Sequence, residues 1–427
     1  MHMLKAILLI SILLFSISFA KYTSAEMEVN MEWNVVADGQ ISYANLSVSV
    51  PSNSSNQKVT SIQISEPYTL DTKGSVWKAN INLENFTQQT IKGKFIVSTD
   101  YIKRATTPDT NYSNYLNSSE LVDINEEITS AASFASSLSF LNSTIALEKW
   151  VHENIEYDKT YISGSYTASL TLQSRKGVCD EFSHLFIAMA RSIRIPARIV
   201  VGYVFDTSGQ IYENETWTPH AWAEVYDPNQ GWIEVDPTYG EFMNLDALRV
   251  RTGTGVDQEN TRDSIQALGF AKNLDILTNV KIKALKKSDR SNVDVNLQLD
   301  PEPKDSMHQP VTIILKNSNP VPIYLTASLA LPQGFECNCS DSIILQPGER
   351  KEISYDVNLS GVAPDMQYNF SVKALTDYGS ADGSFERTYM TPVYTTVKEL
   401  PPQFMIFIGI AVAAAIVLII AALMIKI

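Results

Sequence analysis

The sequence predicts a multidomain protein in which an α+β domain lies between two β-sandwiches and a transmembrane helix ends the chain. The length of 427 residues exceeds that of one ordinary domain and is enough for three. Runs of alternating apolar and polar residues, typical of strands, flank a middle stretch with helical periodicity. Residues 404–425 carry no charge. These three observations predict the order of the parts along the chain.

The chain begins with the pattern of a signal peptide, which we assign to residues 1–25. Lys5 supplies a positive charge, an almost unbroken apolar run extends from residue 6 to residue 20, and small residues then offer cleavage sites. An uncleaved membrane anchor is the alternative. Residues 26–104 alternate between strand-like apolar runs and Asn, Ser, Gly and Pro, which predicts an N-terminal β-sandwich.

The α+β domain is expected at residues 118–270. It is expected to fold by itself, because the linkers near residues 103–117 and 251–262 lack apolar periodicity. Cys179 stands at the start of its main helix. Unpaired backbone N–H groups and the helix dipole at that end favour the thiolate, which is the nucleophilic form of cysteine. The helix is predicted from apolar residues at three-and-four spacing, namely Phe182, Leu185, Phe186, Met189 and Ile193.

A β-hairpin is predicted to supply the partners of this cysteine. Two alternating runs, 220–226 and 232–236, enclose the turn-rich segment 227–231. Because this loop has an odd number of residues, His220 and Asp236 share a face, opposite each other or one diagonal step apart, roughly 5 to 8 Å at Cβ. Asp236 can then orient His220 while His220 takes the proton of Cys179.

A longer series of motifs contains these residues: Gly177-Val178-Cys179, Arg191-Ser192-Ile193-Arg194-Ile195-Pro196-Ala197-Arg198 leading into Val201-Gly202-Tyr203, His220-Ala221-Trp222 with Glu224-Val225, Trp232, and Asp236-Pro237-Thr238. Over roughly residues 145–250 the series resembles the core of the transglutaminase-like superfamily. The resemblance implies a papain-like α+β fold with Cys179, His220 and Asp236 as the catalytic triad. Members of that superfamily include cross-linking enzymes, peptidases, amidases and inactive scaffolds, so the motifs leave the reaction open.

Several other residues of this region are candidates for a role in the site or in the core. The backbone N–H of Cys179 is one expected donor to an oxyanion, and Tyr157 and Gln173 are both candidates for the second donor. His152 and His184 are interpreted as structural. Trp222 and Trp232 are interpreted as hairpin core residues, with the walls of a substrate cleft as the alternative.

An immunoglobulin-like β-sandwich is expected at residues 276–398. Cys337 and Cys339 diverge if they lie on a strand but can be bridged if they lie in a turn. The uncharged run at 404–425 would be about 33 Å long as a helix, which matches the thickness of a bilayer. With the signal peptide, this run predicts a single-pass membrane protein whose bulk is extracytoplasmic. Ten Asn-x-Ser/Thr sequons are compatible with a glycoprotein of the cell surface.

The composition and the absence of certain motifs limit the classes of function that this protein can have. The formal net charge of −14 argues against nucleic-acid binding, and no metal-ligand or phosphate-loop spacing predicts a metal or a cofactor. We expect an exported, membrane-anchored cysteine enzyme that cleaves amide or isopeptide bonds of envelope proteins or peptides through a Cys179 thioester, with hydrolysis favoured over transfer. The rivals are a protein-cross-linking transglutaminase and a non-catalytic scaffold or adhesion module.

Overall fold

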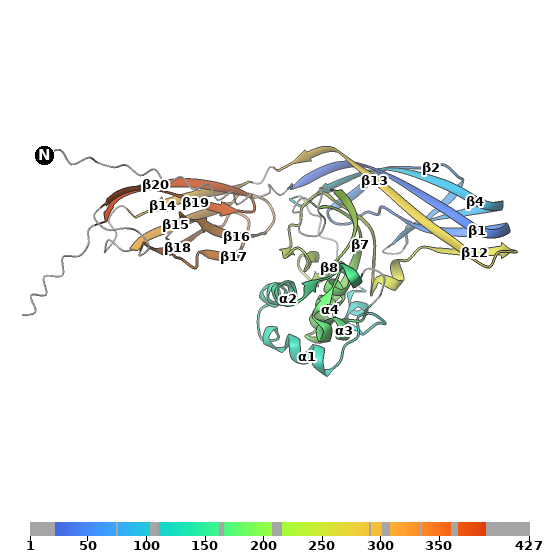
Figure 1. Cartoon of the computed structure of the whole chain (residues 1–427), viewed down its shortest axis with the longest axis horizontal. Helices are drawn as coiled ribbons and strands as arrows, with labels where there is room; N and C mark the ends of the chain where they lie inside the picture. The colour runs from blue at the N-terminus through green and yellow to red at the C-terminus, as the bar shows by residue number, and fades with distance from the viewer. Residues whose placement is uncertain are drawn as a thin grey trace, which may run out of the picture.

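The structure is a computed structural model that describes residues 22–73, 76–102, 109, 111–161, 166–206, 216–289, 292–300, 308–332, 335–359 and 366–389. Most of the expected signal peptide and the whole expected transmembrane helix lie outside these ranges. Within the ranges, no helix is both long enough and apolar enough to cross a bilayer. Figure 1 shows a helical part below a long N-terminal sheet, with a second group of strands at the other end of the molecule.

Six strands form the N-terminal sheet, in the order β12-β1-β4-β2, with β13 also paired to β1 and β3 paired to β4. The register of β1 on β4 shifts between Val36 and Ile41. Buried residues before and after the shift, such as Trp33 and Leu46, contribute to one hydrophobic core. The strands are β1 (Ser24–Val50), β2 (Gln57–Ile64), β3 (Tyr68–Asp71), β4 (Trp77–Asp100), β12 (Ser264–Gly269) and β13 (Leu274–Ser288).

Strands β12 and β13 differ from the expected boundaries, which placed their residues in the α+β domain and in the C-terminal sandwich. Both strands pair with β1, β13 along its first half and β12 along its second. Periodicity shows that a segment is a strand but not which strand it pairs with, because partners so far apart in the chain leave no local signal. Residues that follow the helical part therefore complete the N-terminal sheet. The described residues of 26–104 form this one sheet and not the two sheets of the predicted β-sandwich.

The helical part consists of four α-helices and a five-stranded antiparallel sheet in the order β10-β9-β8-β7-β11. Its α-helices are α1 (Glu126–Ala132), α2 (Phe140–Asn154), α3 (Ala168–Ser174) and α4 (Cys179–Ser192), and its short 3-10 helices are η1 (Tyr112–Leu116), η2 (Ser133–Ala135), η3 (Lys159–Tyr161) and η4 (Gln258–Thr261). The strands of the five-stranded sheet are β7 (Ala197–Asp206), β8 (Thr216–Asp227), β9 (Gly231–Asp236), β10 (Glu241–Phe242) and β11 (Arg249–Gly255). A separate parallel pair is formed by β5 (Glu156–Tyr157) and β6 (Lys176–Gly177).

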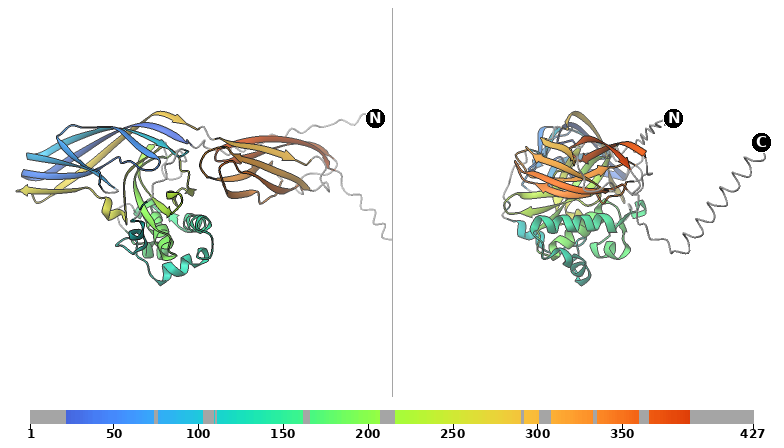
Figure 2. Two further views of the ribbon diagram at one scale, coloured as in Figure 1. Left: turned by 180° about the vertical axis from the view of Figure 1, so that it is seen from behind. Right: turned by 90° about the vertical axis from the view of Figure 1, so that its left-hand side faces the viewer.

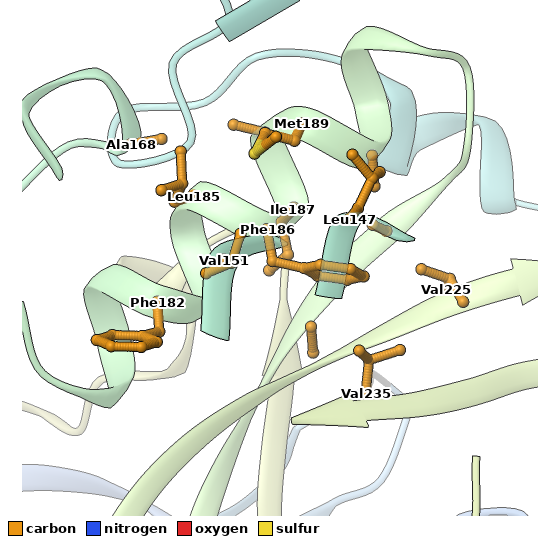
Figure 3. Close-up of a cluster of buried hydrophobic side chains, with 14 of the residues drawn as sticks. Leu147, Val151, Ala168, Phe182, Leu185, Phe186, Ile187, Met189, Val225 and Val235 are labelled. Atoms are coloured by element: carbon orange, nitrogen blue, oxygen red, sulfur yellow. The ribbon is translucent and has the colours of Figure 1, made fainter. Parts of the chain in front are cut away.

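Helix α4 is the central element of this part, and it begins at Cys179 as predicted. Its apolar stripe packs between the other helices and the sheet, where Figure 3 shows Phe186 among side chains of α2, β8 and β9. The helix is buried on nearly every side, from Phe182 to Arg191. Because so much of its surface is covered, packing holds the first residue of the helix in a fixed place.

A buried ion-pair network joins the five-stranded sheet to the N-terminal sheet. Arg251 on β11 donates to Glu224 on β8 and, at 2.6 Å, to Glu234 on β9. The other carboxylate oxygen of Glu234 accepts from the Tyr101 hydroxyl at 2.6 Å and from the Asn56 amide at 3.0 Å. Buried charges require such partners, because an unpaired one costs several kcal/mol. The two parts therefore share polar as well as apolar contacts.

The C-terminal part is a sandwich of two sheets, β14-β15-β18 and β17-β16-β19-β20, which share one hydrophobic core. Figure 2 shows it at the opposite end from the N-terminal sheet. Cys337 and Cys339 lie in an irregular segment, where they form a disulfide, as the turn alternative allowed. The strands are β14 (Val293–Leu299), β15 (His308–Asn317), β16 (Ile323–Ala330), β17 (Ser340–Leu345), β18 (Arg350–Asn358), β19 (Met366–Thr376) and β20 (Gly379–Tyr389).

Candidate active site

Cys179 lies where strand β6 leads into helix α4. Glu181, one turn into the helix, accepts the backbone N–H of Val178 at 2.9 Å and so satisfies a donor at the helix start. A Cβ atom on Gly177 would lie only 2.4 Å from the Cβ of Glu181, so this approach requires glycine. The capping carboxylate and the glycine together position the cysteine. A Glu at the third residue of a helix is a recognisable sequence signal for a helix start, and this signal was not used to predict the helix.

The thiol of Cys179 faces strand β8. The backbone of Ala221, the residue after His220, hydrogen-bonds the sulfur, and the thiol donates to the Asp180 carboxylate at 3.2 Å. Only 9% of Cys179 is exposed. The helix and the hairpin predicted from the sequence therefore meet at this cysteine.

His220 and Asp236 are paired by a hydrogen bond of 2.8 Å between Nε2 and Oδ2. Glu224 lies opposite Glu234 in the hairpin. If the same register continues along the strands, His220 lies one diagonal step from Asp236 on the same face, as the odd loop length predicted. The bond occupies Nε2, which leaves Nδ1 as the nitrogen that can take a proton. Rings of Trp222 and Tyr239 flank the imidazole, with centroids 6.1 and 5.2 Å away.

Asp236 is fully buried and remains ionised. Burial by itself raises the pKa of this carboxyl, but attraction to His220 and to the guanidinium of Arg249 outweighs it and holds the pKa well below the usual value. The backbone N–H groups of Thr238 and Tyr239 also donate to its Oδ1, at 3.1 and 3.3 Å. The aspartate can therefore fix the tautomer of His220 and stabilise its protonated form.

The protonation of Cys179 differs from the expectation based on the helix end. Burial raises the pKa of the thiol well above its ordinary value, and the adjacent Asp180 carboxylate raises it further. The helix dipole is a partial charge, whereas desolvation and a full negative charge both act against the thiolate. The resting sulfur therefore holds its proton, and it needs a base before it can attack.

The two candidates for a second oxyanion donor are separated in space. Tyr157 pairs with Gly177 across β5 and β6, and its ring packs 6.1 Å from that of Phe182 at the start of α4. Gln173 donates to Glu127 at 2.8 Å on an exposed surface. Of the two, the structure brings Tyr157 next to the strand that leads into Cys179.

Four further residues named in the sequence analysis lie in positions typical of structural residues, namely His152, His184, Trp222 and Trp232. His184 is buried in α4 at 1% exposure, burial lowers its pKa to about 4, and His152 hydrogen-bonds the carbonyl of Pro237 at 3.2 Å. Trp222 is 1% exposed in the core beneath the N-terminal sheet. Trp232 donates to Asp109 at 3.0 Å. In the part of the chain that the structure describes, no group of three or more His, Cys, Asp or Glu side chains could hold a metal ion.

Comparison with known proteins finds a family model that matches the segment holding this site. Residues 125–237 match the model of the transglutaminase-like superfamily. YebA of Bacillus subtilis is 36% identical over 99 residues, which are 22% of this chain and 13% of YebA. A protein-glutamine gamma-glutamyltransferase of Pseudomonas aeruginosa is 36% identical over 69 residues, which are 16% of this chain and 10% of that enzyme. The chain thus spans only a small share of these two relatives.

A solved structure of a candidate cysteine protease from Cytophaga hutchinsonii has 19% sequence identity and a TM-score of 0.46, covering 62% of this chain and 91% of that one. The matched family segment contains all three residues of the predicted triad and ends one residue after Asp236. Residues 125–237 of this protein are a transglutaminase-like domain, with Cys179, His220 and Asp236 at one site.

Proposed function

We propose that this protein is a cysteine enzyme that cleaves amide bonds of proteins or peptides through a thioester on Cys179. The observation that supports it most is the meeting of the α4 N-terminus with the hairpin, where the sulfur contacts Ala221 and the neighbouring His220 is bonded to Asp236 at 2.8 Å. A scaffold or adhesion module would not need an ionised, buried aspartate behind a histidine next to a lone thiol.

The proposed reaction begins when His220 takes the proton of the Cys179 thiol at Nδ1. The sulfur then forms a bond to the amide carbonyl carbon, and the backbone N–H of Cys179 donates to the oxyanion. As the tetrahedral intermediate collapses, the C–N bond breaks and the leaving amine takes the proton from His220. A thioester remains. Water or a primary amine then gives a proton to His220 and attacks the thioester carbonyl. The C–S bond breaks, the proton returns to the Cys179 sulfur, and the product is a carboxylic acid with water or a new amide with an amine.

We favour hydrolysis, because no motif of the sequence marks a binding site for an amine. The glutamyltransferase relative supports the alternative, although the match covers only 10% of that enzyme. The test is to incubate the chain with a glutamine-containing peptide, with and without cadaverine, and to follow ammonia release and product mass. We expect Cys179-dependent ammonia release with little incorporation of the amine. Predominant incorporation of cadaverine would establish cross-linking instead, and no reaction with a range of amides would favour the scaffold.

We further propose that the substrates are proteins or peptides of the cell envelope, since the signal peptide and the uncharged run at 404–425 are expected to export and anchor the chain. Protease added to intact cells should then degrade the catalytic part and leave a small C-terminal fragment. Protection of residues 118–270 in intact cells, with cleavage after lysis, would place the enzyme inside the cell.

A further inference from the structure

Arg249 contacts the catalytic aspartate from outside the family segment. It lies on β11, beyond residue 237 where the match ends. Its Nη1 donates to Oδ2 of Asp236 at 2.6 Å, and the same oxygen is bonded to Nε2 of His220 at 2.8 Å. The two nitrogens are therefore at most 5.4 Å apart, the sum of these distances. A permanent cation and the catalytic imidazole share one oxygen of Asp236.

The guanidinium is held firmly in this place. Its Nη2 donates to Glu241 at 2.5 Å, and only 2% of the side chain is exposed. Its central carbon lies 5.5 Å from the ring centroid of Trp222 and 5.6 Å from that of Tyr239. These are the two rings that flank His220. Arg249 is thus packed into the same cluster as the imidazole.

We propose that Arg249 is a positioning residue that fixes Asp236 and, through its charge, keeps the Cys179–His220 pair in the uncharged form before substrate binds. Asp236 stabilises a protonated His220, whereas the arginine cation repels it across a short distance. Transfer of a proton from the thiol to His220 creates such an imidazolium. The aspartate therefore favours the transfer, and Arg249 opposes it.

Several other charged or titratable groups face this cluster and contribute to the balance. They are Glu241 on β10, Glu148 on α2, Asp180 on α4, Asp206 on β7, Tyr239 after β9 and Tyr101 after β4. The carboxylates among them favour a protonated His220, and Glu148 is mostly neutral at pH 7, because burial and then the charge of Asp236 raise its pKa to about 8. Among the described residues, Arg249 is the cation that directly contacts the triad.

The test measures the rate at which iodoacetamide alkylates Cys179 in the full chain as a function of pH, which requires no knowledge of the substrate. In Arg249→Met, which keeps a long side chain without charge, the repulsion is lost and the thiolate–imidazolium pair should form more readily. We expect the midpoint of the alkylation profile to move to lower pH by roughly one unit or more. The same variant should lose about 100-fold in turnover of any amide substrate. Asp236 is still held at Oδ1 by the backbone of Thr238 and Tyr239, but it loses the contact that fixes the direction of Oδ2.

Arg251→Met is the matched control. Arg251 lies two residues further along the same strand and is also buried in two ion pairs, but it bonds Glu224 and Glu234 and no residue of the triad. Its loss should destabilise the chain without moving the alkylation midpoint of the folded protein. Equal midpoint shifts in both variants would show a general loss of packing and overturn the proposal.

An unchanged midpoint in folded Arg249→Met would also overturn it. If that variant does not fold, Arg249→Gln decides, because its neutral amide removes the charge but can still donate to Asp236. We then expect a shift in the same direction, and a midpoint equal to that of wild type would reject the role. The proposal depends on the proposed function only through turnover. If no amide substrate is found, the alkylation profiles still test whether Arg249 affects the Cys179–His220 pair.

Discussion

Replacing Cys179 with alanine is expected to reduce amide-bond turnover by several orders of magnitude, because no other group near His220 can form the thioester. His220→Ala removes the base that the protonated thiol needs. Asp236→Asn keeps the shape of the side chain but loses the charge that stabilises the imidazolium. All three changes should give losses of similar order in kcat/KM, measured by ammonia release from the glutamine peptide.

These losses should not add, because the three residues act as one unit. Once Cys179 is alanine, the second change His220→Ala should cost little more. His184→Gln is the control, since His184 on α4 is, like His220, a buried histidine, and neither of its ring nitrogens has a hydrogen-bond partner among the described residues. It should keep most of the turnover. Losses that simply multiply, or a His184→Gln variant as inactive as Cys179→Ala, would contradict the triad.

A fragment of residues 118–270 is expected not to fold, although the sequence suggested that this segment is independent. Trp222, Val200, Leu245, Leu248 and Val250 are buried in the core that they share with the N-terminal sheet. Exposing a large buried apolar side chain costs about 1.5–3 kcal/mol, so five of them amount to on the order of 10 kcal/mol. That is comparable with the whole stability of a domain, about 5–15 kcal/mol.

The fragment would also leave Glu234 without the Tyr101 hydroxyl and the Asn56 amide that it binds. Residues 22–289 retain these partners and strands β12 and β13, and this longer piece should fold. Circular dichroism and a thermal transition for each piece provide the measurement. A cooperative transition of the 118–270 fragment near that of the longer piece would show that the helical part folds without the N-terminal sheet.

Much of the candidate site could be predicted from the sequence, because its signals are local. The apolar spacing from Phe182 to Met189 placed Cys179 at the start of a helix. The odd loop between two strands placed His220 and Asp236 on one face. Neighbouring residues in a helix or a hairpin are related by the geometry of the backbone itself, so the pattern along the chain determines their arrangement.

Only the tertiary structure decided what depends on neighbours distant in sequence. The pairing of β13 with β1, the contact of Arg249 with Asp236, and the pairing of Tyr157 with Gly177 all join segments that carry no shared local pattern. The protonation of Cys179 belongs to the same group. A helix start favours the thiolate in any sequence, but the degree of burial is set by the whole fold, and desolvation is the larger effect on this sulfur.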